Sequence, residues 1–252
     1  MITDPIFYLA AIPAVLIYGI ANGGFGGGVG VVAVPLMALG VSPVQAAAIL
    51  LPILCVMDLL ALWVFRGRWR WPELKLLIPS SLAGIAVGTL LFGYMSADTI
   101  RLILGTIAVT FTLHWLWLQS QRSPAPERLF GPGVGIVAGA SAGFTSFVAH
   151  AGAPPLSIYL LRRGMDRTTF VATAAVFFAV ANFVKLVPYA WLGQLDASNL
   201  STSLVLSPLA PVGIAAGKWL HDRVSDRFFF GFAYVTLLLV GGKLMWDGLT
   251  NL

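Results

Sequence analysis

The feature that most constrains this chain is its division into long apolar runs separated by short polar loops. Eight such runs are present, at residues 5–41, 43–65, 74–95, 98–118, 132–161, 168–192, 199–220 and 228–247. A helix that spans the hydrocarbon core of a bilayer needs about 20 consecutive apolar residues. Six runs match that length and predict one membrane-spanning helix each, whereas the first and fifth runs are too long for a single crossing.

The composition supports a membrane protein and excludes several other classes. Only 10% of the 252 residues are charged, and 58% are hydrophobic, whereas soluble domains carry about a quarter charged residues. The net charge of +5 does not indicate nucleic acid, because the basic residues occupy short loops, where they act as topology signals. The single cysteine, Cys55, excludes disulfides, and the three histidines lack ligand spacing. We therefore expect no metal, no cofactor and no nucleic-acid partner.

The two long runs are interrupted by glycine and proline. Residues 22–30 read NGGFGGGVG, and residues 143–155 read GFTSFVAHAGAPP. Glycine and proline weaken a helix interior by about 1 and about 3 kcal/mol per residue, respectively. We therefore expect each long run to split into two short helical pieces around an irregular turn.

The two halves of the chain resemble each other. Gly19, Gly23 and Pro35 recur 120 residues later as Gly139, Gly143 and Pro155. The motif GIAVG at 84–88 recurs as GIAAG at 213–217, and Trp117 is repeated as Trp246 at the same shift of 129 residues. The pattern predicts a first repeat at 1–118 and a second at 132–252, joined by a polar cytoplasmic linker at 119–131.

The basic residues discriminate between two topologies, because positive charge marks the cytoplasmic side. If all eight runs cross once, Arg66, Arg68, Arg70, Lys75, Arg122 and Arg128 oppose Arg101, Arg162, Arg163, Arg167, Lys218, Arg223 and Arg227, which is no bias. If the fifth run instead enters and returns on one side, Arg101 alone opposes the other twelve. This predicts a re-entrant hairpin in the fifth run and, by the repeat, in the first.

The predicted fold is therefore an all-α integral membrane protein with two inverted repeats. Each repeat contains a re-entrant or broken helical hairpin followed by three transmembrane helices, and the odd number of crossings inverts one repeat relative to the other. Inverted repeats with interrupted helices that meet near the middle of the membrane are typical of secondary transporters.

The two irregular turns are the candidate binding site. Irregular backbone inside a bilayer occurs only where it is buried in protein or lines a polar cavity, and free amide groups near helix N-termini bind anions. The candidate residues are Asn22, Gly23, Gly24, Gly26, Gly27 and Gly28 in the first turn, and Thr145, Ser146, His150 and Gly152 in the second. The alternative is that the glycines only allow close helix packing, since Gly19, Gly23 and Gly27 recur every four residues.

Ionisable residues inside apolar runs also point to the binding of an anion. Lys185 shares a helix face with Asn182 and would pair with an anionic substrate or a carboxylate, unless it extends to the interface. Asp58, which aligns with Asn182 in the repeat, is the candidate counter-charge, unless it pairs with a loop arginine. His150 would donate to an anion or take up a coupling proton, or be structural.

Enzymatic function is not expected from the sequence. The chain contains no G-x-S-x-G, H-E-x-x-H or nucleotide-binding motif. The nearest approach to a nucleophile with a base is Ser141 or Ser146 with His150, which is a weak signal.

The two interrupted runs resemble a known family. GIANGGFGGGVGVVAVPLMALGVSPVQAAAILLP at 19–52 resembles the first repeat of the TauE/SafE sulfite exporter family, also called TSUP, although Ala48 and Ile49 replace small polar residues of many members. GFTSFVAHAGAPPLSIYLLRRGMDRTTFVATAAVFFAVANFVK at 143–185 is similar to the second repeat. Its matching positions are Gly152, Pro154, Pro155, Asn182 and Lys185.

The resemblance implies a function. It implies a secondary transporter in the inner membrane that carries sulfite or a small organosulfonate, mostly outward, between the two turns. An anion channel of the same fold is the main alternative, and a membrane-embedded enzyme is a weaker one. The expected partners are a small anion and the lipid bilayer, with a homo-oligomer left open.

Overall fold

Helices make up every regular element that the computed structural model describes. It describes residues 1–27, 30–92, 94–120, 131–221, 223 and 226–250. The first half contains α1 (Pro5–Gly24), the short η1 (Gly30–Val32), α2 (Ala33–Met37), α3 (Pro43–Val64), α4 (Trp71–Phe92) and α5 (Ala97–Ser120). The second contains α6 (Pro132–Ala149), α7 (Ala153–Leu160), η2 (Leu161–Arg163), α8 (Arg167–Trp191), α9 (Ala197–Leu206), α10 (Leu209–His221) and α11 (Asp226–Thr250).

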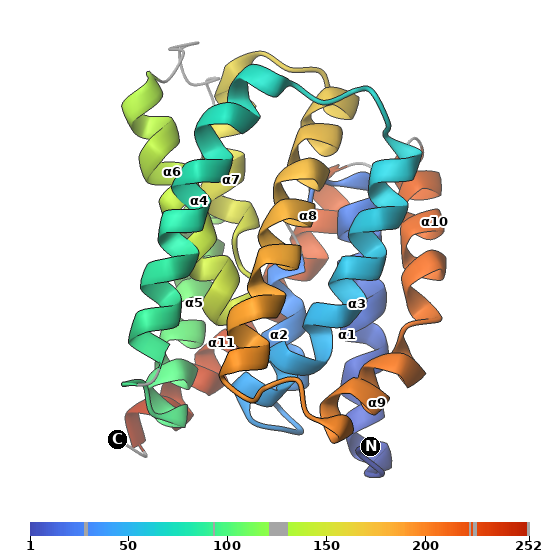
Figure 1. Ribbon diagram of the computed structural model, residues 1–252, viewed down its shortest axis with the longest axis vertical. Coiled ribbons are helices and arrows are strands. Elements are labelled where there is room, and N and C mark those ends of the chain that lie inside the picture. The colour runs from blue at the N-terminus through green and yellow to red at the C-terminus, as the bar shows by residue number, and fades with distance from the viewer. Residues whose placement is uncertain (28–29, 93, 121–130, 222, 224–225, 251–252) are drawn as a thin grey trace.

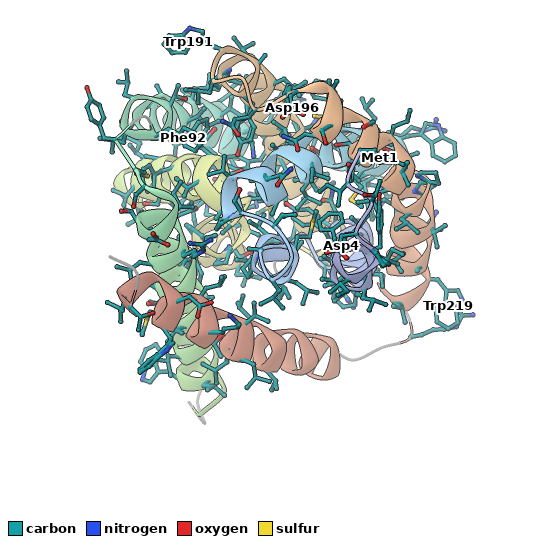
Figure 2. All side chains as sticks on the ribbon, turned by 90° about the horizontal axis from the view of Figure 1, so that it is seen from below. Met1, Asp4, Phe92, Trp191, Asp196 and Trp219 are labelled. Atoms are coloured by element: carbon teal, nitrogen blue, oxygen red, sulfur yellow. The ribbon has the colours of Figure 1, made fainter. Side chains whose placement is uncertain are left out.

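Five of these helices are long and apolar enough to cross a membrane: α1, α3, α4, α6 and α8. A sixth span results if α9 and α10, which meet at a bend of 44°, count as one. Helices α5 and α11, expected as crossings from the runs 98–118 and 228–247, are not among them within the described residues. Large apolar side chains face outward, including Trp191 and Trp219, which are 79% and 57% exposed (Figure 2). This is the surface that a lipid environment requires.

Both long runs form hairpins. In the first, Gly40 packs against Phe7 and Gly30 packs against Tyr18, so the chain returns beside α1. In the second, Gly135 near the start of α6 packs against Tyr159 near the end of α7. Helix α1 rises from the lower end of the bundle and α6 descends from the upper end (Figure 1). The inversion of the two repeats stays a prediction.

The breaks lie within the predicted segments 22–30 and 143–155, but the helical pieces on their two sides differ in length. The expectation of two short pieces in each long run is wrong for the first limbs, because α1 has 20 residues and α6 has 18, whereas α2 has 5 and α7 has 8. Except for Gly133, the glycines inside α1 and α6 are tolerated because each allows another helix to approach closely. The free energy of that packing offsets the weak helix propensity of glycine.

Glycine contacts pair helices from opposite halves. Helix α1 packs on α10, where a Cβ atom on Gly23 would collide with the backbone of Ile214. Helix α6 packs on α4, where a Cβ atom on Gly143 would collide with the backbone of Ser81. The recurring GIAVG and GIAAG motifs supply the partner surfaces in α4 and α10. The first helix of each half is therefore held by a helix of the other half.

Basic residues gather at one end of the bundle. The guanidinium of Arg70 donates to the carbonyl of Arg163 at 2.9 Å, and Arg167 donates to the carbonyl of His221 at 2.7 Å. These bonds join the α3–α4 loop, the α7–α8 connection and the end of α10. The end of the bundle that these segments form is called the basic end below. Arg101 and Lys243 lie outside it, beside the bend at 38–41.

The hairpin topology can be tested with single cysteines. In a Cys55→Ala background, Gly131→Cys and Gly164→Cys should react with a membrane-impermeant maleimide from the same membrane face, and Gly193→Cys from the opposite face. All three glycines have open space around the Cβ position, so the new thiols are accessible. Labelling of Gly131→Cys and Gly164→Cys from opposite faces would contradict a hairpin in α6 and α7.

The glycine packing predicts a stability difference within α6. Gly143→Ala should lower the free energy of unfolding by about 1–3 kcal/mol, because the added Cβ meets the backbone of Ser81. Gly133→Ala, at a position with no atom within 4 Å, should leave stability unchanged or slightly raised. Thermal unfolding in detergent, followed by tryptophan fluorescence, measures both. Equal midpoints for the two variants would show that this helix contact is not tight.

Candidate functional site

One face of α8 carries the residues that organise the site. Phe178, Asn182, Lys185 and Tyr189 follow one another at helical spacing and are all buried. The helix begins at Asp166, whose carboxylate accepts from the backbone N–H of Thr169 at 3.0 Å. This cap and the Thr169 hydroxyl hold the pKa of Asp166 below its usual value, since both donate to the ionised form. The cap fixes the start of α8 and hence the register of its buried face.

Lys185 lies at the centre of a cluster with the end of α6. Its Nζ atom donates to the carbonyl oxygen of Ser146 at 2.9 Å, to Ser146 Oγ at 2.9 Å and to His150 Nδ1 at 2.8 Å. His150 Nε2 lies 2.9 Å from the carbonyl oxygen of Ala47 in α3. A carbonyl oxygen only accepts, so Nε2 carries the hydrogen and Nδ1 accepts from the ammonium. A charged Lys185 with a neutral His150 ring satisfies all of these contacts.

The backbone of His150 is unusual. With φ of 50°, it is the one non-glycine residue in the left-handed region among the residues described. It ends α6 through a bond from its N–H to the carbonyl of Ser146 at 3.0 Å. Glycine usually occupies such a position. A histidine here lets the ring reach Lys185 and Ala47 and stack on Tyr189, and strained residues of this kind cluster at functional sites.

Asp58 forms a second cluster one helical turn away along α8. Its two carboxylate oxygens accept from the side-chain amides of Asn22 at 3.1 Å and Asn182 at 2.6 Å. Three helices therefore meet at this carboxylate: α1, α3 and α8. The alternative that Asp58 pairs with a loop arginine does not hold, because the described part of the chain shows no ion pair to it.

The two clusters place opposite charges in the interior without pairing them. Lys185 and Asp58 are 0% and 1% exposed, and within the described ranges no ion pair includes either of them. Lys185 therefore does not extend to the membrane interface, which is the alternative role that the sequence allowed. Burying a charge costs several kcal/mol even after relaxation. Ionisable groups held this way inside a membrane protein usually serve transport.

The two glycine turns lie on either side of one aromatic ring. A Cβ atom on Gly27 would stand 3.3 Å from Phe178 Cε2, and one on Gly152 would stand 3.1 Å from Phe178 Cε1. Gly26, with φ of 65°, lies against the ring of Phe170. Both turns thus approach α8 on either side of this ring, and they also meet each other, since a Cβ atom on Gly27 would stand 3.7 Å from the Cβ of Ala153. Gly28 lies outside the described residues.

Three predicted residues do not join the site. Gly23 and Gly24 lie in the last turn of α1, where their N–H groups belong to the helix and their Cα atoms pack on α10. Their amides are not free in this conformation, and the alternative of close packing accounts for both glycines. Thr145 Oγ1 donates to the carbonyl of Ser141 at 2.8 Å, so this hydroxyl is used by its own helix. Glycine spacing alone does not distinguish a turn from a packing surface.

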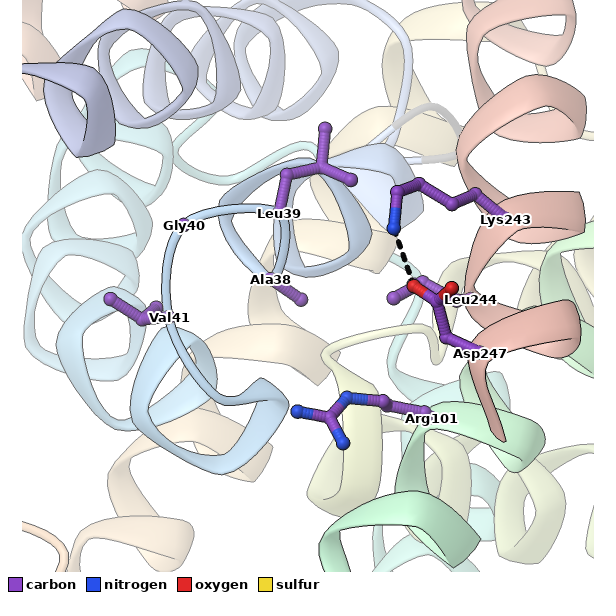
Figure 3. Close-up of a pocket in the computed structure, with 8 residues that line it drawn as sticks. All are labelled: Ala38, Leu39, Gly40, Val41, Arg101, Lys243, Leu244 and Asp247. Atoms are coloured by element: carbon purple, nitrogen blue, oxygen red, sulfur yellow. Dashed lines mark hydrogen bonds and ion pairs between the residues drawn. The ribbon is translucent and has the colours of Figure 1, made fainter. Parts of the chain in front are cut away.

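A surface hollow of about 380 Å³ lies away from these clusters. It is formed by residues 38–41 after α2, together with Arg101 of α5 and Lys243, Leu244 and Asp247 of α11 (Figure 3). Lys243 is bonded to Asp247, and Arg101 to Asp98. No predicted site residue lines it.

Several residues of the site were missed in the sequence. Tyr189 donates its hydroxyl to the carbonyl of Phe147 at 2.7 Å and holds the end of α6 against α8. Tyr189 lies one helical turn after Lys185, and Phe178 lies one turn before Asn182. This spacing was the sequence pattern that could have indicated both residues. The buried Glu73 accepts from Tyr159 at 2.8 Å and Arg163 at 2.9 Å, which fixes α7 to α4. Nothing local in the sequence indicates that contact.

The burial of Lys185 without an ion pair among the described residues predicts how its replacement affects stability. Lys185→Met should leave the thermal midpoint equal to that of the wild type or raise it. The desolvation of the ammonium, which costs several kcal/mol and is removed in the variant, offsets the three lost hydrogen bonds, each worth about 1.5–3 kcal/mol because the donor is charged. Lys75→Met, at an exposed position, is the control and should change nothing. A fall of more than about 5 °C in Lys185→Met alone would show that Lys185 is retained for structure.

Comparison with known proteins agrees with this architecture. Residues 11–244 match the family described as Sulfite exporter TauE/SafE. A protein of Cupriavidus necator named "Probable sulfite/organosulfonate exporter TauE" is 24% identical over 229 residues, which cover 88% of this chain and 86% of that protein. No solved structure matches the chain. The match covers most of the sequence and accords with the five to six apolar helices, so this multi-pass membrane protein belongs to the TauE/SafE family of transporters.

Proposed function

We propose that this protein exports a small sulfur oxyanion, sulfite or an organosulfonate, across the inner membrane. The family and the name of the relative support this class of substrate. The observation that carries the proposal is Lys185, a buried ammonium that contacts neutral acceptors at the tip of the second hairpin and has no carboxylate partner among the described residues. An anion is the partner that such a charge lacks.

Binding at Lys185 requires a local exchange of hydrogen bonds. Each N–H of the ammonium already has an acceptor in Ser146 or His150. A sulfonate or sulfite oxygen must replace one of them, and it forms a stronger, charge-assisted bond than a neutral acceptor does. The displaced group belongs to the turn between α6 and α7. Anion binding would therefore loosen the tip of that hairpin, which links occupancy to movement.

Asp58 gives the site a carboxylate that can take up a proton. Its carboxylate orients the side-chain amides of Asn22 on α1 and Asn182 on α8. While ionised, it repels an anion that approaches Lys185 along α8. We propose that a proton taken up at Asp58 or His150 removes or offsets that repulsion and so couples proton movement to anion transport.

The orientation of the protein in the membrane follows from the two ends of the bundle. Because basic residues mark the cytoplasmic side, the basic end would face the cytoplasm. The hollow beside Arg101 would then lie on the opposite, external side. Movement of one repeat against the other would expose the clusters to each side in turn, as in transporters built from repeats.

Transport by the purified protein in liposomes tests the proposal. Radiolabelled sulfite and taurine should be taken up by counterflow, with saturation, and Lys185→Ala should reduce the rate by about 100-fold because it removes a charge-assisted contact. His150→Ala should reduce it less, since His150 supports Lys185 from one side. Lys75→Ala is the control and should transport normally.

The same preparation distinguishes a carrier from a channel. A channel would pass current across a planar bilayer and show no counterflow. Full transport in both Lys185→Ala and His150→Ala would remove the charge role assigned here, and absence of transport of any sulfur oxyanion by the wild type would remove the substrate class.

A further inference from the structure

The ring of Phe178 packs beside the point at which the two turns meet, where Gly27 lies against Ala153. Its Cε1 edge faces Gly152 and its Cε2 edge faces Gly27, so opposite edges of one ring touch the two hairpins. The side chain is 3% exposed and also packs edge-to-face on Phe177, with ring centroids 5.2 Å apart. Any bulkier residue than glycine at either turn would meet this ring. The contact therefore depends on the aromatic ring and on the absence of a side chain at both glycines.

The position of Phe178 along α8 relates it to the polar clusters. Helix α8 begins at the basic end and carries Phe178 before Asn182 and Lys185. At 1.5 Å per residue, Lys185 lies about 10 Å further from the basic end than Phe178 does. Gly152 also contacts Ser146, a partner of Lys185, so the ring lies directly beside the lysine cluster. The ring stands between that cluster and the basic end.

We propose that Phe178 is the gate between the lysine cluster and the basic end, and that it sets the size of the anion admitted. The inference rests on the proposed function. In this conformation the ring and the adjacent contact of Gly27 with Ala153 close the space between the two hairpins, and rotation of the ring together with a separation of the turns opens it. Glycine at positions 27 and 152 lets both turns close on the ring without a gap. A flat ring between two glycines gives a narrow opening, which suits sulfite and small sulfonates.

The gate can be tested without knowledge of the substrate. Ser146→Cys in a Cys55→Ala background places a nearly isosteric thiol beside Lys185, behind the ring. Its reaction with a small, charged methanethiosulfonate reagent is measured from each membrane face. Adding Phe178→Ala should accelerate the reaction from the basic end by about tenfold, because the open state gains population. Phe178→Leu retains more volume and serves if the alanine variant does not fold.

Phe177→Ala is the matched control. Phe177 is equally buried and adjacent, but it is not among the nearest neighbours of Gly27 or Gly152. It should leave the reaction rate within about twofold of the parent. Equal acceleration by Phe177→Ala and Phe178→Ala, or acceleration by Phe178→Ala only from the face opposite to the basic end, would overturn the gate.

Transport in liposomes gives the second readout. In the otherwise unchanged chain, Phe178→Ala should raise the rate for benzenesulfonate relative to sulfite by about tenfold, as expected when a steric barrier is removed. Phe177→Ala should leave that ratio unchanged. An unchanged ratio in Phe178→Ala would refute the size filter. If the wild type carries no sulfur oxyanion, the proposed function fails, and the thiol measurement still decides whether Phe178 is a gate.

Discussion

The interaction on which the site depends is the contact between the ammonium of Lys185 and the tip of the second hairpin. Ser146 supplies two acceptors and His150 a third, and the other side of the histidine ring bonds to Ala47 in α3. This chain of bonds joins α3, α6 and α8 through one buried charge. Because the acceptors are neutral, the charge is solvated but not cancelled, which leaves it available to an anion. The left-handed backbone of His150 is retained because this network needs an imidazole at that point.

Around this network, the bundle is assembled by close backbone contacts between halves. Glycine pairs α1 with α10 and α6 with α4, and Gly105 and Gly248 bring α5 and α11 together in the same way. Inside a membrane, helices gain little from burying apolar side chains, since lipid is equally apolar, so packing of small residues carries the association. The polar clusters lie where hairpins and crossing helices meet, which shields them from lipid.

The sequence predicted those features that depend on the order of apolar, basic and ionisable residues along the chain. Apolar runs and the placement of arginines predicted helices and two hairpins, and ionisable residues in apolar runs pointed to Asp58, Lys185 and His150. Other features left no such pattern. Phe178 is one of many aromatic residues in apolar sequence, so its place between two turns depends on tertiary contacts. Gly23 and Gly27 belong to the same motif, yet one packs on a helix and the other forms a turn, because each role requires only the absence of a side chain.

The pairing of α1 with α10 has a consequence for biosynthesis. Gly19 packs on Gly213, and Gly24 packs on Gly217, which makes α10 the partner of α1. Because α1 lies near the start of the chain and α10 near its end, α1 is synthesised long before its partner. During translation α1 enters the membrane with a glycine surface and the amide of Asn22 still unpartnered. Asn22 can bond Asp58 as soon as α3 follows, but the glycine surface must wait for the second half. The first repeat therefore remains incompletely packed until nearly the whole chain is inserted, and that interval is when insertion factors or quality-control proteases have access to it.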